Sequence, residues 1–325
     1  MYFLELGGED DAFAAREATT AATGVERVAS ALAVAGSVDA DRVRTLAYTH
    51  RASELLARTD ASVESATAAL AATPLGRTGS VAVRARDVRG GTSVSTQEAE
   101  RALGSVLVER GFSVDLDDPD HVLRACFSGE VCLLGWQVAE SVRDFGERKP
   151  TARPFFQPGG MDPLDARALA NLAGAGGGTR VLDPMCGTGG LLLEAGLVGA
   201  RVLGVDAQWK MVRGADENLG RYLDDGFATV RGDATRLPVC DGTADAVVFD
   251  APYGKQSKVV GDLAALVSGA LGEARRVAPR AVLVADRPWT DAAREAGWAV
   301  ESTIERRVHR SLVRYIHLLL SEPTD

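Results

Sequence analysis

Four aspartates in the second half of the chain each follow a short apolar run that is typical of a buried β-strand. In chain order, these residues are Asp183, Asp206, Asp233 and Asp250. A carboxylate can accept hydrogen bonds from sugar hydroxyls or amines, and it can serve as a general base. The same residue type at four successive strand ends predicts a shared ligand site.

Strands and helices alternate through this half, which predicts the sheet that positions the aspartates. The predicted strands are RVLD (180–183), RVLGVD (201–206), ATVRGD (228–233), AVVFD (246–250), RAVLVAD (280–286) and two closing strands. Such alternation favours a parallel sheet with helices on both faces. Ligands of these sheets bind beyond the carboxyl ends of the strands. We therefore expect an α/β, doubly wound fold with its site at that edge.

A glycine-rich turn follows the first predicted strand, and Gly187 and Gly189 would let the backbone approach a ligand closely. The turn is not a dinucleotide fingerprint, because Leu192 stands where a third glycine is expected, and no G-x-x-x-x-G-K-[ST] string occurs. Asp206 is positioned to accept both ribose hydroxyls of a nucleoside, and Asp233 could lie beside an adenine amino group. Cys186 lies inside the turn, but with no histidine nearby in sequence we do not interpret it as a nucleophile.

Over about residues 155–325 the chain resembles the class I S-adenosylmethionine-dependent methyltransferases. The most specific element is Asp-Ala-Pro-Tyr-Gly at 250–254. It is similar to the [DNS]-P-P-[YFW] signature of enzymes that methylate exocyclic amines of bases or amide nitrogens, with Ala251 in place of the first proline. The resemblance implies a Rossmann-like sheet and S-adenosylmethionine as cofactor. The cofactor would be bound by Asp183, Gly187, Gly189, Asp206 and Asp233.

The chemistry of such an amine explains why these residue types would be needed. A lone pair delocalised into a purine ring makes the exocyclic amine a poor nucleophile. Hydrogen bonds from its N–H groups to the Asp250 carboxylate and the Pro252 carbonyl would orient it towards the sulfonium methyl, while Tyr253 would stack on the base. These three residues are the predicted catalytic set. Whether Asp250 also takes the proton stays open.

The first half mixes strands and helices in the manner of an α+β domain. Expected strands cover residues 1–6, 30–36, 80–88, 121–127 and 130–140, and expected helices cover 11–23, 61–72 and 96–110. The last helix is the best marked, with Ser95 as its N-cap, Glu98 three residues later and Gly111 after its end. The strands on either side of Ser128 and Gly129 are expected to form a hairpin.

This half resembles a THUMP domain, an RNA-binding module of tRNA-modifying enzymes, over about residues 50–145. Three short strings extend the likeness to the archaeal enzymes that methylate the N2 amine of guanosine 10 in tRNA. They are RPFFQP at 153–158, LDAR at 164–167 and NLA at 171–173. The resemblance implies tRNA as partner and a dimethylated product.

A stretch rich in proline and glycine, residues 143–163, separates the two halves. We therefore expect an N-terminal domain at 1–150 that contains the THUMP module and a methyltransferase domain at 151–325. A length of 325 residues agrees with two domains.

The net charge of −9 excludes a uniformly basic nucleic-acid-binding protein. Only four of the 36 basic residues are lysines, and acids outnumber bases, so we hypothesise adaptation to a high-salt interior. A polyanionic partner would need local arginine clusters, of which two exist. One is Arg77, Arg84, Arg86 and Arg89, and the other is Arg306, Arg307, Arg310 and Arg314. Arg84, Arg86 and Arg89 are the candidates for RNA phosphate contacts, with a merely solvated face as the alternative.

Several other classes have no support in the sequence. The start MYFLELGGEDD is unlike a signal peptide, and no apolar run is long enough to span a membrane. The four cysteines and four histidines are dispersed without metal-ligand spacing. We expect a cytoplasmic protein that needs no metal.

Rival functions remain open at this point. A DNA adenine N6 methyltransferase would share the second half, and a protein glutamine methyltransferase would more typically carry asparagine where Asp250 stands. The chain could also methylate guanine N2 at another tRNA position, or be a non-catalytic RNA-binding protein whose loop Ala251 has inactivated. The number of methyl groups added and the oligomeric state are not determined by the sequence.

Overall fold

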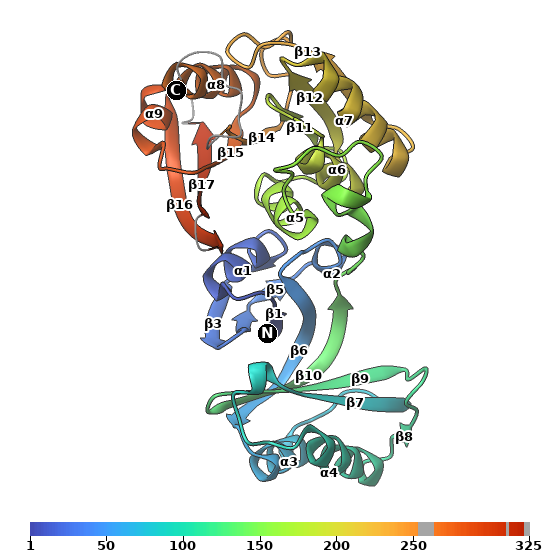
Figure 1. Cartoon of the computed structure of the whole chain (residues 1–325). Coiled ribbons are helices and arrows are strands. Elements are labelled where there is room, and N and C mark those ends of the chain that lie inside the picture. The colour runs from blue at the N-terminus through green and yellow to red at the C-terminus, as the bar shows by residue number, and fades with distance from the viewer. Residues whose placement is uncertain (253–262, 310–311, 322–325) are drawn as a thin grey trace. The chain divides into compact units, whose positions relative to one another are not determined.

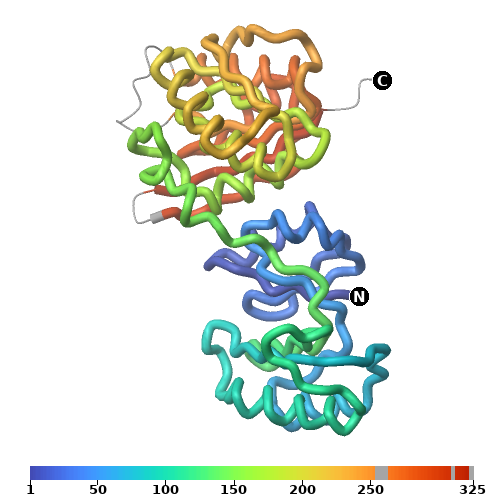
Figure 2. The backbone as a smooth tube through the Cα atoms, turned by 90° about the vertical axis from the view of Figure 1, so that its right-hand side faces the viewer, coloured from blue at the N-terminus to red at the C-terminus, as the bar shows by residue number. Residues whose placement is uncertain are grey.

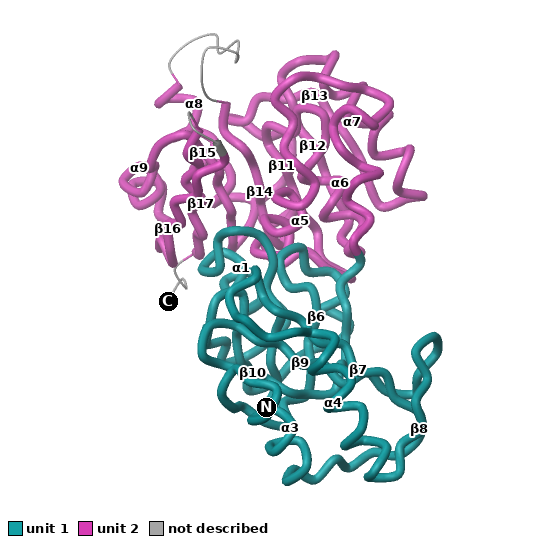
Figure 3. The backbone as a smooth tube through the Cα atoms, turned by 60° about the horizontal axis from the view of Figure 1, so that its bottom comes forward, with its two compact units in different colours: residues 1–142 teal, residues 143–325 magenta. Residues whose placement is uncertain are grey.

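The computed structural model describes residues 1–252, 263–309 and 312–321. The chain divides into two compact units, Met1–Val142 and Arg143–Asp325, which Figure 3 distinguishes by colour. Each unit has its own sheet, and each is described here by itself.

The first unit is built on an eight-stranded sheet in the order β3-β4-β1-β6-β10-β9-β7-β8. Its strands are β1 (Tyr2–Leu6), β3 (Glu26–Ala29), β4 (Leu32–Ala35), β6 (Thr49–Asp60), β7 (Ser80–Asp87), β8 (Ser113–Val114), β9 (His121–Ser128) and β10 (Val131–Glu140). Two short strands, β2 (Ala22–Thr23) and β5 (Ser37–Val38), form a separate pair. As expected, β9 and β10 form an antiparallel hairpin, with Ser128 opposite Val131.

Two helices, α3 (Val63–Ala72) and α4 (Thr96–Glu109), lie side by side in Figures 1 and 2 and contact each other. They bury Leu70, Leu103 and Leu107 in one core with the sheet residues Phe127 and Trp136. The predicted N-cap of α4 is confirmed, because Ser95 accepts a hydrogen bond from the backbone N–H of Glu98. The shorter helical elements of this unit are α1 (Asp11–Ala18), α2 (Ala40–Val43) and the 3₁₀ turn η1 (Val88–Gly90).

One expectation for this unit was inaccurate, and one central strand was not anticipated. The helix expected over 11–23 ends at Ala18, because the Thr19 and Thr20 hydroxyls bond back to the carbonyls of Arg16 and Glu17. Strand β6 was not anticipated, although it is twelve residues long and pairs with both β1 and β10. Its sequence, THRASELLARTD, is too polar to read as a central strand, and only its two partners fix it there.

The second unit has a seven-stranded sheet in the order β13-β12-β11-β14-β15-β17-β16. Its strands are β11 (Arg180–Asp183), β12 (Arg201–Asp206), β13 (Phe227–Arg231), β14 (Ala246–Asp250), β15 (Arg280–Ala285), β16 (Trp298–His309) and β17 (Leu312–Ser321). The first five are parallel, as predicted. Strand β17 lies between β15 and β16 and is antiparallel to both. Only two residues separate it from β16, and so short a connection cannot place two strands in parallel.

The helices of this unit are α5 (Pro163–Leu172), α6 (Gly190–Leu197), α7 (Trp209–Tyr222), α8 (Leu263–Val277) and α9 (Thr290–Glu295), after the 3₁₀ turns η2 (Phe145–Arg148) and η3 (Pro150–Ala152). Helix α6 contacts both α5 and α7, and α8 contacts α9. Val267, Leu271 and Val277 of α8 share a core with the sheet residues Val247 and Phe249. The predicted α/β doubly wound class is confirmed for this unit (Figure 1).

Candidate active site

The strand ends of the second unit form a stepped edge around Asp183. Asp183 lies level with Gly204 of β12, so Asp206 extends two residues farther. Leu182 lies level with Val247 of β14, so Asp250 also extends about two residues beyond Asp183. Strand β11 therefore ends about two residues before its neighbours β12 and β14, and Asp183 at its end is only 2% exposed. From β11 the chain adds β12 and β13 on one side and then β14 and β15 on the other, and ligands of such folds bind where the strand order reverses in this way.

The glycine turn after β11 is connected directly to the end of β12. The backbone N–H of Gly187 donates to Asp206 Oδ2 at 3.0 Å, and the N–H of Cys186 donates to the Val205 carbonyl. Gly187 and Gly189 have φ values of +51° and +79°, which residues with a Cβ rarely adopt. The turn therefore depends on glycine for its conformation at both positions.

Small residues also let this turn lie close to the sheet. A Cβ at Gly204 of β12 would approach Cys186 Sγ to 2.9 Å and the Leu192 side chain to 2.9 Å. The close helix–strand packing that a dinucleotide fingerprint obtains from a third glycine is thus obtained here from a glycine on the neighbouring strand.

The residues around this turn fit S-adenosylmethionine. A Cβ at Gly187 would meet no atom within 4 Å, so the turn is open on that side. Gly189 caps α6 without a side-chain hydrogen bond, which leaves the N-terminus of this helix able to receive a carboxylate. Each oxygen of Asp206 accepts one backbone N–H, from Gly187 or from Gln208, and retains a lone pair for a ribose hydroxyl.

Electrostatics at the edge favour a cation. Burial raises the pKa of the Asp183 carboxyl well above its ordinary value, opposed by the N–H of Met185 and reinforced by the charges of Asp206 and Asp250. Burial also raises the pKa of Asp206, although the N–H groups of Gln208 and Gly187 work against the shift. A positively charged ligand such as a sulfonium would stabilise these carboxylates in their ionised form.

Asp233 has a different environment from the other two. It is exposed, and hydrogen bonds from the backbone N–H and hydroxyl of Thr235 lower the pKa of its carboxyl. Strand β13 itself ends at Arg231, so Asp233 belongs to the loop beyond the strand. It therefore stays ionised and open to solvent at this edge.

The predicted amine-binding motif is described in part. Asp250 is half-buried at the end of β14, level with Val284, and the N–H of Ala251 donates to the Val284 carbonyl at 2.8 Å. Ala251 thus extends the hydrogen bonding to β15 by one residue before Pro252. Tyr253, together with residues up to 262, lies outside the described residues.

Cys186 is buried inside the turn. Burial raises the pKa of its thiol well above the ordinary value, and the charges of Asp183 and Asp206 act in the same direction. The thiol therefore stays protonated and inert, and it packs as a small apolar residue.

One positioning residue was not found from the sequence. Asn218 of α7 accepts the N–H of Phe155 at 2.9 Å, and its amide donates to the carbonyls of Phe155 and Thr188, each at 2.9 Å. Phe155 packs on Gly214, where a Cβ would overlap its ring. Asn218 thus ties the segment before α5 to the glycine turn. The available sequence signal was an asparagine on the apolar face of an amphipathic helix, four residues after Gly214.

A buried ion-pair cluster supports α6 on its other side. Glu194 pairs with Arg148 Nε at 2.9 Å and with Arg167 Nη2 at 2.8 Å, and all three side chains are almost completely buried. Arg148 also pairs with the half-exposed Asp144. The cluster holds η2 and α5 against the helix that begins at the glycine turn.

The predicted phosphate-binding arginines of the first unit all have partners within the chain. Arg86 donates to Glu5 at 3.2 Å, and Arg89 donates to Asp11 at 2.6 Å. Asp11 compensates the charge of Arg89, whereas Arg86 shares the Glu5 carboxylate with the buried Arg124, which donates to Glu5 at 2.7 Å.

Arg84 differs from these two arginines. It donates to the carbonyl of Leu116 at 2.7 Å, which is a neutral group, so its positive charge remains uncompensated by that bond.

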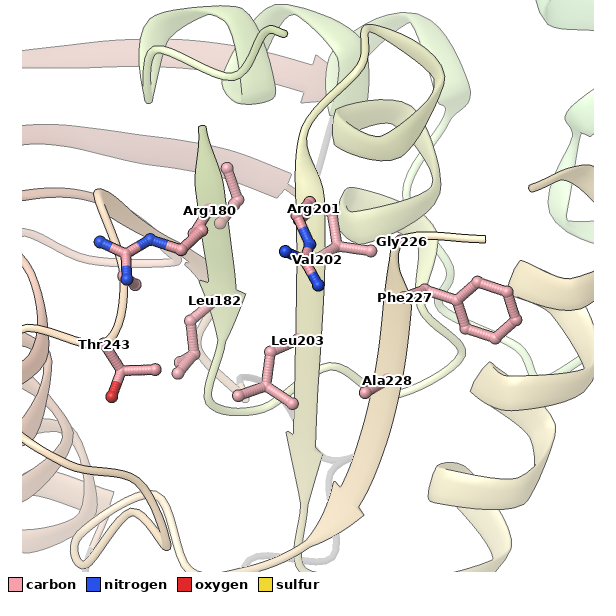
Figure 4. Close-up of a pocket in the computed structure, with 11 residues that line it drawn as sticks. Arg180, Leu182, Arg201, Val202, Leu203, Gly226, Phe227, Ala228 and Thr243 are labelled. Atoms are coloured by element: carbon pink, nitrogen blue, oxygen red, sulfur yellow. The ribbon is translucent and has the colours of Figure 1, made fainter. Parts of the chain in front are cut away.

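A cavity of about 420 Å³ lies elsewhere on the second sheet (Figure 4). Its lining includes Arg180 and Leu182 of β11, Arg201 and Leu203 of β12, and Phe227 of β13. These residues belong to the amino-terminal parts of their strands, whereas the aspartates stand at the carboxyl ends. We therefore do not assign the cofactor to this cavity.

Among residues 1–252, 263–309 and 312–321, no helix combines the length and apolar character needed to cross a membrane. The same described part of the chain contains no group of three or more His, Cys, Asp or Glu side chains arranged to hold a metal ion.

Comparison with known proteins agrees with this arrangement. A 185-residue match, 42% identical and covering 56% of this chain, joins it to the tRNA (guanine(10)-N2)-dimethyltransferase of Methanothermobacter thermautotrophicus, and it spans about half (54%) of that relative's length. The Pyrococcus abyssi protein of the same name is 34% identical over 74% of each chain. The crystal structure of TrmN from Thermus thermophilus superposes with a TM-score of 0.51 at 26% identity, covering 99% of this chain and 100% of that one.

The family described as RMKL-like, methyltransferase domain, matches residues 150–316, which contain the glycine turn, the four predicted site aspartates and the motif that begins at Asp250. That range is about half of the chain, and the methyltransferase resemblance inferred from the sequence is thereby confirmed. With its strand order and its carboxyl-edge aspartates, the chain belongs to this methyltransferase family.

Proposed function

We propose that this chain transfers methyl groups from S-adenosylmethionine to the exocyclic N2 amine of guanosine 10 in tRNA, first one and then a second. The observation that carries the proposal is the sheet register. It brings Asp250 of the proposed amine-binding motif to the strand next to Asp183, at the point where the strand order reverses. Similarity to two named tRNA (guanine(10)-N2)-dimethyltransferases supports the choice of substrate.

The proposed cofactor residues each have a separate role. Asp206 accepts the ribose hydroxyls, the open turn at Gly187 and Gly189 receives the methionine part, and Asp233 accepts the adenine amine. Asp183, at the end of β11, faces the positive charge of the sulfonium. When bound, S-adenosylmethionine supplies an electrophilic methyl group on a sulfonium.

The amine is oriented by the end of β14. The Asp250 carboxylate and the Pro252 carbonyl accept its two N–H groups, which turns the nitrogen lone pair out of conjugation and towards the methyl group. Tyr253, a proposal from the sequence alone, stacks on the guanine. Because the target amine lies within the body of tRNA, the base must leave its stack to reach Asp250.

We propose that the first unit carries the RNA-binding THUMP module, built from β6, β7, β9 and β10 with α3 and α4 on the sheet. Among its predicted phosphate ligands we favour Arg84, because its bond to a neutral carbonyl leaves its charge available. Arg89 pairs with Asp11, and Arg86 contacts the Glu5 carboxylate that it shares with Arg124, so each of these side chains is already held by a carboxylate and would contribute less. A protein that acts on tRNA is expected to work in the cytoplasm.

Labelled methyl transfer to unmodified tRNA transcripts tests the proposal. We expect incorporation into the wild-type transcript and none into a matched transcript with adenosine at position 10. Nucleoside digestion should yield N2,N2-dimethylguanosine after a monomethylated intermediate. Undiminished incorporation into the adenosine transcript would refute the position and favour guanine N2 methylation elsewhere in tRNA.

Two further substrates separate the rival functions. Incorporation into adenine-containing duplex DNA but not into tRNA would favour an adenine N6 methyltransferase. Binding of both tRNA and S-adenosylmethionine, with no methyl transfer to any tRNA, would favour a non-catalytic RNA-binding protein.

A further inference from the structure

The second arginine cluster of the sequence has no role in the proposed function. Three of its members, Arg306, Arg307 and Arg314, lie near the tip of the β16–β17 hairpin (Figure 1). Arg306 stands directly opposite Arg314, and Arg307 opposite Val313. We call these three arginines the hairpin tip. Arg310 lies outside the described residues.

Sheet register brings the hairpin tip to the same edge as Asp250. Strand β17 is antiparallel to both β15 and β16, so β16 runs in the direction of the parallel strands and its end lies at their carboxyl edge. Asp250 is level with Val284, and Val284 is level with Ile316. Arg314 therefore extends two residues beyond the level of Asp250.

The separation of the two sites follows from standard sheet dimensions. Strand β17 is the second strand from β14, which is about 10 Å, and two residues along a strand add about 7 Å. The Cα atoms of Asp250 and Arg314 are then about 12 Å apart. Strands β11, β12 and β13, which carry or precede the cofactor aspartates, lie on the other side of β14. The hairpin tip thus flanks the amine side of the site and not the cofactor side.

Two of the three arginines of the hairpin tip are paired within the chain. Arg306 and Arg314 both pair with the carboxylate of Asp165 on α5, at 2.5 and 3.2 Å. Because both guanidinium groups contact this carboxylate, Arg306 and Arg314 are held in place within the second unit.

Arg307 points to the other face of the hairpin from Arg306, since neighbouring residues of a strand alternate. Arg307 is exposed, and within the described part of the chain its side chain makes no hydrogen bond or ion pair. Glu305, also exposed, lies on the same face but farther from the tip. Among the described arginines of the hairpin tip, Arg307 is therefore the exposed one.

We propose that the hairpin tip binds the RNA backbone next to the target nucleotide, with Arg307 donating to a phosphate. This inference rests on the proposed function, because it assumes RNA at Asp250. A base turned out towards Asp250 leaves its sugar and flanking phosphates at the rim of the site, and the fork of a guanidinium matches phosphate oxygens. The partner is thus a phosphodiester chain on the amine side of the edge.

Arg307→Ala is the informative variant, because removing an exposed side chain without an intrachain partner does not disturb the fold. We expect its Kd for a tRNA transcript to rise about threefold to tenfold at moderate salt. Its plot of log Kd against log KCl concentration should lose about 0.7 to 0.9 in slope, the value for one phosphate contact. The Kd for S-adenosylmethionine and the kcat at saturating tRNA should not change.

One further variant is a matched control, and another tests the sign of the charge at position 307. Arg280→Ala removes an exposed arginine at the first residue of β15, which is the opposite edge of the same sheet, and should leave tRNA binding unchanged. Arg307→Glu should weaken binding more than Arg307→Ala does. Wild-type tRNA affinity and salt slope in Arg307→Ala, or equal losses in Arg307→Ala and Arg280→Ala, would overturn the proposal.

The binding measurement needs no catalysis, which separates this inference from the proposed function. If the wild-type protein methylates no tRNA but Arg307→Ala still lowers tRNA affinity and salt slope as expected, the hairpin contact stands and the methyl-transfer proposal fails. If the wild-type protein methylates tRNA and Arg307→Ala binds it unchanged, only the hairpin contact fails.

Discussion

Asp206 accepts a hydrogen bond of 3.0 Å from the backbone N–H of Gly187, and this bond joins the end of β12 to the glycine turn after β11. A second bond, from the N–H of Gln208 at 2.8 Å, fixes the other carboxylate oxygen. The carboxylate is thus held in one orientation before any ligand arrives, which lowers the cost of binding.

Replacing Asp206 by asparagine should weaken S-adenosylmethionine binding about tenfold to a hundredfold. The amide cannot accept on both of its polar atoms, and a hydrogen bond to a charged group contributes about 1.5 to 3 kcal/mol. Calorimetric titration measures the change. Asp216→Asn, on the exposed side of α7, is the matched control and should bind the cofactor normally. Equal affinity in both variants would contradict the ribose role.

Asp250→Ala should reduce kcat at least about a hundredfold, because the amine is then no longer oriented towards the methyl group. Cofactor affinity should stay close to that of the wild-type protein, since Asp250 lies on the amine side of Asp183. Single-turnover methyl transfer and cofactor titration on the same preparation test both statements. Retained transfer would remove Asp250 from the catalytic set.

Asp183→Asn should make the cofactor-free protein more stable at neutral pH while weakening cofactor binding. Burial places the pKa of Asp183 in the folded state above its ordinary value of 3.8. The contribution of this carboxyl to stability is therefore fully present below about pH 3.8 and is lost as pH rises through the folded-state pKa. The difference in melting temperature between variant and wild type should grow with pH. A difference independent of pH would contradict the assignment.

Glu194→Gln should lower the free energy of unfolding by about 3 to 5 kcal/mol, because it leaves the buried guanidinium groups of Arg148 and Arg167 without their shared anion. Asp144, the other partner of Arg148, has a side chain that is 45% exposed. Asp144→Asn should therefore lower the free energy of unfolding by less than about 1 kcal/mol. Chemical denaturation of the two variants gives the comparison. Similar losses would mean that the buried pairs add nothing beyond a surface ion pair.

Molar KCl should raise the unfolding midpoint if the surplus of acids is an adaptation to salt. The chain has 45 acidic and 36 basic residues, and salt screens the repulsion among unpaired carboxylates. Sucrose, which strengthens burial without carrying charge, is the control for a general solute effect. The hypothesis fails if KCl gives no gain in stability, or no more than sucrose gives.

Features that depend on neighbours along the chain could be predicted from the sequence alone. The Ser95 cap, the glycine turn at Gly187 and the acid at the end of each of three parallel strands follow from local periodicity and turn chemistry. Helix–strand alternation then allowed few arrangements other than a parallel sheet with its site at the carboxyl edge.

The tertiary structure decided everything that depends on partners distant in sequence. Only the fold pairs the polar strand β6 with its two neighbours, and only the fold brings Asn218 to Phe155 and Arg148 to Glu194. Hydrogen bonds and ion pairs of this kind join residues tens of positions apart, so no local pattern announces them. Arg84 and Arg86 illustrate the same point. They are the same residue type, two positions apart on one strand, but Arg84 donates to a backbone carbonyl and Arg86 to a carboxylate, and both partners are distant in sequence.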